Sequence, residues 1–194
     1  MNLPNRLTVM RMILVPFFVA AVLYPFPHHF LIAFILFAVA SYTDHLDGKI
    51  ARKRNLITNF GKFMDPLADK VMVLSAMVCL VSQDLADVWI VVLVVAREFM
   101  VTSIRLVAAD RGRVIAANMW GKAKTVSQIV AILAVLLMQY LLELGSMGIL
   151  SLSAESGLIM GMVGDVLLAI AAFFTVLSGL VYLRHNWDIL REGA

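Results

Sequence analysis

The chain has 194 residues, of which 62% are hydrophobic and only 15% are charged, and its mean hydropathy is +0.92. These values exclude an ordinary water-soluble globule and indicate one polytopic membrane domain over residues 1–194, since the length leaves no room for a further soluble module. The net charge of +3 does not indicate nucleic-acid binding, because the basic residues lie between apolar segments as topology signals do, and the single cysteine excludes an internal disulfide.

Apolar segments long enough to cross a bilayer as helices recur along the whole chain. The N-terminal segment is not followed by a convincing small-residue cleavage site, so we interpret it as a transmembrane helix and not as a signal peptide. The expected fold class is all-α, a polytopic integral membrane protein with about six transmembrane helices. We place them near residues 7–25, 30–53, 60–82, 87–109, 118–142 and 160–186.

The loops between these segments fall into two sets of different charge. All sixteen lysines and arginines lie on or near the two termini and residues 53–60 and 110–118. The alternate loops 25–29, 83–86 and 143–159 contain none. By the positive-inside rule, the basic loops and both termini are expected in the cytoplasm, and the protein in the inner or plasma membrane of the cell.

The first stretch, residues 2–11, is amphipathic, and Pro4 suits the start of a helix. Its polar positions include Asn5, Thr8 and Arg11, which are spaced three residues apart. One interpretation is a short interfacial helix whose arginines reach the membrane surface. A second interpretation depends on a family resemblance given below.

Four carboxylates lie within residues 44–69 of a chain otherwise suited to lipid. Asp44 and Asp47 are three residues apart, and Asp65 and Asp69 are four apart, so each pair lies on one face of its own helix. The polar stretch between the pairs lets the two helices return as a hairpin, which brings the acids to one end. A charge at mid-membrane costs about 2.5–3.5 kcal/mol on insertion scales, and like charges repel. We therefore expect Mg²⁺ or Mn²⁺, which suit clustered carboxylates, to bind here.

Small and basic residues accompany these acids. Gly48 and Gly61 each lie about one helical turn from an acid, and neither has a side chain that would keep a ligand away from the backbone. Ala51 continues the small face, and Arg52 adds a fixed cation.

The complete pattern, D-x-x-D-G-x-x-A-R, eight residues, G-x-x-x-D-x-x-x-D, resembles that of the CDP-alcohol phosphatidyltransferases. The resemblance implies a membrane enzyme, typically a homodimer, that uses CDP-diacylglycerol. It implies two divalent ions held by Asp44, Asp47, Asp65 and Asp69, with Asp69 also the general base. It implies that the liponucleotide lies beside Gly48, Ala51, Arg52 and Gly61.

Further cations lie on the fourth and fifth expected spans. Arg97 and Arg105 are eight residues apart, about two turns, so they share a helix face. Arg105 and Lys122 have no nearby acid in the sequence apart from Asp110, and such a positive pocket suits a phosphate group. Arg97 has two interpretations, a phosphate contact or a structural pair with Glu98.

Two segments narrow the resemblance to the branch of the family that uses glycerol 3-phosphate. They are R-E-F-x-V-T-x-x-R and A-A-N-M-x-G-K-x-K-T, at residues 97–105 and 116–125. The implied ligands of the acceptor's phosphate are Arg97, Arg105 and Lys122. The N-terminal N-x-x-T-x-x-R pattern also resembles this branch, where it lies beside the nucleotide, so CDP-diacylglycerol contacts are expected from Asn5, Thr8 and Arg11.

Three neighbouring residues have other interpretations. His45 stands where this branch commonly has an aromatic residue, and it should point about 100° away from the acidic face, so we expect no metal contact from it. Lys124 and Arg113 are interpreted as topology signals or as contacts to the anionic head groups of membrane lipids.

The expected reaction is attack of the 1-hydroxyl of glycerol 3-phosphate on the phosphorus that carries diacylglycerol, which gives phosphatidylglycerophosphate and CMP. An alternative keeps this reaction and changes the acceptor to inositol phosphate, serine or a lipid, which the aspartates do not exclude. A transporter would more naturally place its acids at mid-membrane in inverted repeats. An intramembrane prenyltransferase lacks the G-x-x-A-R segment.

Overall fold

The computed structural model describes residues 3–53, 59–113, 115 and 118–191, and the side chains of these residues except 3, 4, 45–53, 59, 60, 62, 63, 154, 189 and 190. All regular structure within this part is helical, as the sequence predicts. The helices are α1 (Leu3–Leu23), α2 (His29–Lys53), α3 (Asn59–Ser82), α4 (Val88–Asp110), α5 (Met119–Ser146), α6 (Ala154–His185) and α7 (Trp187–Arg191).

The six long helices follow the six expected spans closely. The largest difference is at α6, which begins at Ala154 and not near 160. Ser153 takes its N-cap position without a side-chain hydrogen bond to the helix. Three described segments are long and apolar enough to cross a membrane, namely Asn5–Leu23, Met119–Ser146 and Glu155–His185, and α2 contributes a shorter apolar stretch, His29–Asp44. The structure is that of a membrane protein.

The expected short interfacial helix is not a separate element. Helix α1 runs without a break from Leu3 to Leu23 and includes Pro16 in its interior. Three polar residues of its first turns are buried within the bundle, since Asn5, Thr8 and Arg11 are 7%, 0% and 1% exposed. These three side chains therefore lie against other helices of the bundle.

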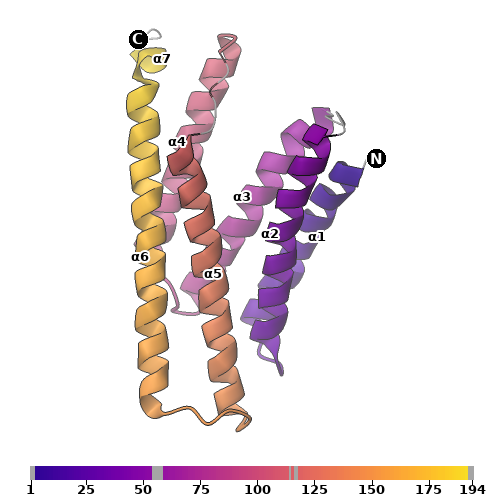
Figure 1. Cartoon of the computed structure of the whole chain (residues 1–194), viewed down its shortest axis with the longest axis vertical. Helices are drawn as coiled ribbons and strands as arrows, with labels where there is room; N and C mark the ends of the chain where they lie inside the picture. Colours follow the sequence, from indigo (N-terminus) through magenta and orange to yellow (C-terminus); the bar gives the residue numbers. More distant parts are fainter. Residues whose placement is uncertain (1–2, 54–58, 114, 116–117, 192–194) are drawn as a thin grey trace.

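The helices form two groups that meet through α5 (Figure 1). Helix α1 packs on α2 and α3, helix α6 packs on α4 and α5, and α5 packs also on α2. The start of α1, the end of α2, the end of α4 and helix α7 lie at one end of the molecule, whereas the α1–α2 and α5–α6 connections lie at the other (Figure 1). The alternation of loop charge in the sequence therefore corresponds to the two ends of the bundle.

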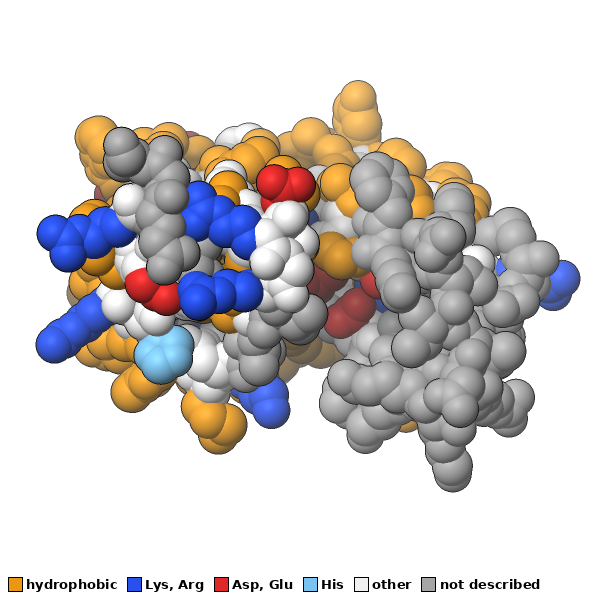
Figure 2. Space-filling model, turned by 90° about the horizontal axis from the view of Figure 1, so that it is seen from above, with side chains coloured by type: hydrophobic (Ala, Val, Ile, Leu, Met, Phe, Trp, Pro, Cys, Tyr) orange, Lys and Arg blue, Asp and Glu red, His pale blue; other side chains and the backbone are white. Residues whose placement is uncertain are grey.

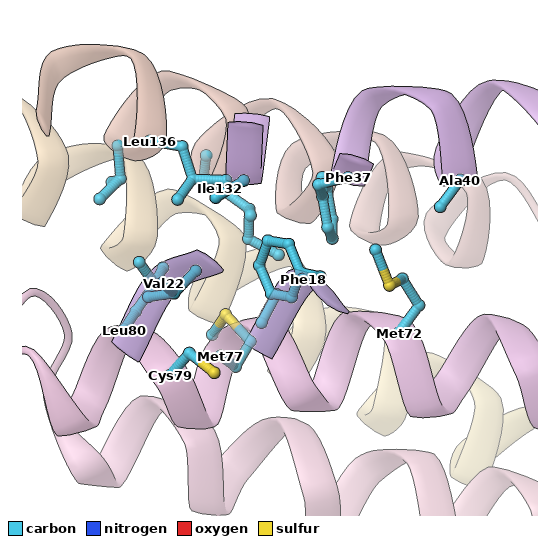
Figure 3. Close-up of a cluster of buried hydrophobic side chains, with 14 of the residues drawn as sticks. Phe18, Val22, Phe37, Ala40, Met72, Met77, Cys79, Leu80, Ile132 and Leu136 are labelled. Atoms are coloured by element: carbon cyan, nitrogen blue, oxygen red, sulfur yellow. The ribbon is translucent and has the colours of Figure 1, made fainter. Parts of the chain in front are cut away.

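An apolar core joins the two groups of helices. Phe18 of α1 and Phe37 of α2 are almost fully buried, with ring centroids 5.7 Å apart. Figure 3 shows part of the cluster around them, to which all of the helices from α1 to α6 contribute buried residues. Its buried members include Val22, Ala40, Met72, Met77, Cys79, Leu80, Ile132 and Leu136.

Polar contacts fix the far ends of the helices. The Glu143 carboxylate of α5 accepts hydrogen bonds from the backbone N–H groups of His29 and Phe30, at 3.2 and 3.3 Å. These donors belong to the first turn of α2, whose N–H groups have no partner within the helix. In the middle of the bundle, Gln128 of α5 donates to Thr175 of α6 at 3.3 Å. Helix α5 is thus hydrogen-bonded to α2 at the end opposite the termini, and to α6 further along.

Candidate functional site

Two acids of the aspartate motif at residues 44–69 are hydrogen-bonded to one face of α1. Thr8 and Arg11 lie one turn apart on this face and are fully buried. The Thr8 hydroxyl donates to Asp65 Oδ1 of α3 at 2.5 Å, and Arg11 Nη1 donates to Asp44 Oδ1 of α2 at 2.6 Å. The α2–α3 hairpin therefore converges on α1, and the two acids lie side by side along it.

The remaining described acid of the motif lies one turn beyond Asp65 on α3. Asp69 lines a pocket between α3, α4 and α5. The walls are completed by Lys70, Val73, Leu74, Val94, Glu98, Lys124, Thr125 and Gln128. At this end of the molecule, Figure 2 shows acidic side chains set back in a hollow and basic side chains gathered on the side of α4, α6 and α7.

The carboxylates present suit a hard divalent ion. Asp44 and Asp65 supply the oxygen ligands that Mg²⁺ and Mn²⁺ prefer, and α1 brings them together. Within the described residues, no group of three or more His, Cys, Asp or Glu side chains is arranged to hold an ion. Gly61 is buried at the start of α3. The side chains of His45, Asp47, Ala51 and Arg52 lie outside the described part, as does the packing around Gly48.

A second cluster joins α4, α5 and α6 through Glu98. Its Oε1 atom accepts from Arg97 Nη1 at 2.8 Å and from Lys124 Nζ at 2.6 Å. Arg97 Nε also donates to the Ser178 hydroxyl of α6 at 3.2 Å. The structural pair of Arg97 with Glu98, one of the two interpretations from the sequence, is therefore present.

The interpretation of Lys124 as a topology or head-group residue is wrong. The side chain is only 7% exposed, forms an ion pair with Glu98, and lines the same pocket as Asp69. Two residues along a helix correspond to a rotation of about 200°, so Lys124 points away from the side on which Lys122 is exposed. The signal in the sequence was Gln128, one turn later on the same face, which marks this face as polar.

Arg105 lies further along α4 and also faces α6. Its Nε atom donates to the Tyr182 hydroxyl at 3.2 Å, and the guanidinium lies 5.7 Å from the centre of the Tyr182 ring. Since Ser178 and Tyr182 are one turn apart on α6, Arg97 and Arg105 share a face, as their spacing predicts. Within the described part of the chain, no carboxylate pairs with Arg105 or with Lys122, and both side chains are exposed.

The start of α5 adds a further positive element beside Arg97. The Asn118 side chain caps this helix by accepting from the Gly121 N–H at 2.8 Å. A Cβ atom at Gly121 would lie 3.1 Å from Asn118 Oδ1 and 3.7 Å from Arg97 Nη2, so glycine leaves room between the cap and the guanidinium. A helix N-terminus with an arginine beside it attracts anions.

Comparisons with known proteins identify the family of the chain. A family model described as CDP-alcohol phosphatidyltransferase matches residues 1–177. The chain belongs to this family. The pattern at residues 44–69 that resembles this family lies on the end of α2 and the start of α3.

Relatives within the family include enzymes named CDP-diacylglycerol–glycerol-3-phosphate 3-phosphatidyltransferase. The chain is 45% identical to that of Bacillus subtilis over 98% of this chain and 97% of the relative. It is 36% identical to that of Rickettsia felis over 94% of both chains. It is 40% identical to that of Haemophilus influenzae over 68% of this chain and 73% of the relative.

The contact between Arg11 and Asp44 predicts a measurable effect on stability. Asp44→Asn should lower the free energy of unfolding by about 1–3 kcal/mol, because buried Arg11 loses a charged partner that is itself 40% exposed. The measurement is thermal unfolding in detergent with chelator, so that metal binding does not contribute.

The matched control is Asp165→Asn, which changes an exposed acid on α6 and should leave the midpoint unchanged. The double variant Arg11→Met/Asp44→Asn should be less destabilised than the sum of its single changes, since both remove the same contact. Additive effects would show that the contact does not stabilise the fold.

Proposed function

We propose that this protein is a phosphatidylglycerophosphate synthase, which transfers the phosphatidyl group of CDP-diacylglycerol to sn-glycerol 3-phosphate and releases CMP. The observation that carries the proposal is the placement of two complementary sites at one end of the bundle. Acids converge on α1, and cations lie on α4 and α5 beside the pocket that contains Asp69. The shared name of the relatives supports the choice of substrates.

Asp69 is the proposed general base. Its carboxylate would take the proton of the 1-hydroxyl of glycerol 3-phosphate. The oxygen then forms a bond to the phosphorus that carries diacylglycerol, and the bond from that phosphorus to the CMP oxygen breaks. Because Asp69 lies in a pocket between three helices, bulk water, which would compete as an acceptor, has limited access to the reacting groups.

The metal-binding residues in this proposal are Asp44, Asp47, Asp65 and Asp69, which would hold two Mg²⁺ or Mn²⁺ ions. Bound divalent ions neutralise the pyrophosphate and the charge of the leaving CMP. Thr8 and Arg11 orient two of these carboxylates through the hydrogen bonds of α1. We place the nucleotide beside the same face of α1 and the small face of the motif, with contacts from Asn5, Thr8, Arg11, Gly48, Ala51, Arg52 and Gly61.

The acceptor's phosphate is assigned to Arg97, Arg105 and Lys122. Tyr182 and Ser178 hold the two arginines against α6, so the guanidinium groups are already positioned when the acceptor arrives. Arginine suits this role because its planar donors match phosphate oxygens. A different acceptor alcohol, such as inositol phosphate, serine or a lipid, is the alternative that the aspartates alone do not exclude.

The proposed location is the inner or plasma membrane, with both termini and the site on the cytoplasmic side. The support is that the ends of α2 and α4, which lead into the basic loops of the sequence, lie at the same end of the bundle as the site (Figure 1). The acyl chains of the liponucleotide then remain in the bilayer while its head group enters from the cytoplasm. We further propose a homodimer, on the basis of the family resemblance.

Activity should require a divalent ion. Protein purified with chelator should lose turnover, because the pyrophosphate and the carboxylates repel one another without a cation between them. Added Mg²⁺ or Mn²⁺ should restore it, whereas Na⁺ at the same ionic strength should not. Full activity of metal-free protein in excess chelator would refute the assignment of the aspartates.

Substitutions at Asp69 and Arg105 should affect different steps, namely turnover and binding of the acceptor. Asp69→Asn should lower turnover by at least about 10²-fold, the scale of general-base loss, and should still bind CDP-diacylglycerol. Arg105→Ala should chiefly raise the KM for glycerol 3-phosphate, since it removes a charge-assisted contact worth about 1.5–3 kcal/mol.

The measurements are acceptor KM, liponucleotide binding and thermal stability on the same purified variants. A change of Arg113, an exposed cation paired with Asp188, serves as the control for loss of positive charge at this end. If Arg105→Ala lowers the folded yield and leaves the acceptor KM unchanged, the phosphate assignment of Arg105 is wrong.

The orientation is tested with cysteines introduced at positions 28, 84 and 148 in a Cys79→Ala background. Positions 28 and 148 lie in connections at the end opposite the site, and position 84 lies in the α3–α4 loop. An impermeant thiol reagent added to whole cells should label all three, because these loops lack positive charge. Labelling of a cysteine at position 112 in intact cells would show that the true orientation is the opposite of the proposed one.

A further inference from the structure

The first half of α3 is held on two sides by side-chain hydrogen bonds. On one side, the Asp65 carboxylate accepts from the Thr8 hydroxyl of α1. On the other side, the Lys70 ammonium donates to the Thr102 hydroxyl of α4. Asp69, the proposed base, lies between them in the sequence, one turn after Asp65 and directly before Lys70. The two hydrogen bonds therefore enclose the part of α3 that carries this carboxylate.

The side of α3 that faces α4 has little other packing. Helix α3 packs mainly on α1, and much more lightly on α4 and α5. The pocket that contains Asp69 lies on this lightly packed side, and Lys70 lines it as well. Where few contacts join two helices, one polar contact has a larger share in fixing their separation. The hydrogen bond from Lys70 to Thr102 is therefore suited to set the distance between α3 and α4 at the pocket.

Thr102 is oriented to receive the Lys70 ammonium. Its hydroxyl group donates to the backbone carbonyl of Glu98, one turn earlier on α4, at 2.6 Å. A hydroxyl group has one proton and two lone pairs, so this bond uses the proton and leaves the oxygen able to accept. Because Lys70 is charged, the hydrogen bond that it donates is stronger than one between neutral groups. The bond thus joins the turn of α3 that carries Asp69 to the turn of α4 that carries Glu98.

We propose that Lys70 is a positioning residue for the reaction, which acts through Thr102 to hold the Asp69 carboxylate at a fixed distance from α4. The proposal rests on the proposed function, since it takes Asp69 as the base. Lys70 touches no substrate in this role. A displacement of about 1 Å at the reacting groups can cost about 10²-fold in rate, so loss of the hydrogen bond should appear in turnover and not in substrate binding.

The test compares kcat and the KM of each substrate for Lys70→Met, Lys70→Arg, Thr102→Val and Thr102→Ser at saturating Mg²⁺. Methionine and valine approximate the size of the side chains that they replace and remove the hydrogen bond, whereas arginine and serine can still form it. Ser103→Ala is the matched control, because it removes an exposed hydroxyl group from the next position of α4. Thermal unfolding of each purified variant measures its stability separately.

Lys70→Met and Thr102→Val should each lower kcat by about tenfold or more, with both KM values within about twofold of wild type. The double variant Lys70→Met/Thr102→Val should fall no further than Lys70→Met alone, because both changes remove the same hydrogen bond. Lys70→Arg and Thr102→Ser should retain most of the wild-type kcat, and Ser103→Ala should behave as wild type.

A normal kcat in Thr102→Val would overturn the proposal, because Lys70 would then act without this partner. A raised KM for either substrate with an unchanged kcat in Lys70→Met would show a direct substrate contact, and would overturn it as well. A lower melting temperature with unchanged kinetics would show a purely structural role, with the same consequence. If the wild-type protein does not convert CDP-diacylglycerol and glycerol 3-phosphate, the proposed function itself fails, which is a different result from normal turnover in the variants.

Discussion

The structure depends on the cost of placing charges inside an apolar bundle. A charged group away from water must have a partner, and this requirement fixes which helices meet at the site. Arg11 is fully buried and pairs with Asp44, while Thr8, one turn away, binds Asp65. Because these contacts form only when α1 lies against the α2–α3 hairpin, they position the acids and the helices together.

The same requirement organises the other side of the site. Glu98 compensates Arg97 and Lys124 between α4 and α5, and Ser178 and Tyr182 orient the arginines from α6. The apolar core below, around Phe18 and Phe37, supports both arrangements and shares α5 between them (Figure 3). Acids and cations that lie far apart in the sequence therefore reach one end of the bundle.

Much of this could be predicted from the sequence because hydropathy and charge are local signals. The helix bounds followed from apolar runs, and the shared face of Arg97 and Arg105 followed from their eight-residue spacing. Contacts between helices could not be predicted in this way. A polar face such as that of Thr8 and Arg11 suits an interface with lipid head groups as well as a buried interface. Lys124 could not be distinguished from a topology signal until its partner Glu98 was located on a different helix.

The proposed function requires the two charged arrangements to serve one reaction between a liponucleotide and a phosphorylated alcohol. The most direct test incubates purified protein and Mg²⁺ with labelled CDP-diacylglycerol and, separately, glycerol 3-phosphate, glycerol, inositol phosphate, inositol and serine. We expect phosphatidylglycerophosphate and CMP with glycerol 3-phosphate, and little product with glycerol, which lacks the phosphate. Equal turnover with glycerol and glycerol 3-phosphate, or product only with serine or inositol, would contradict it.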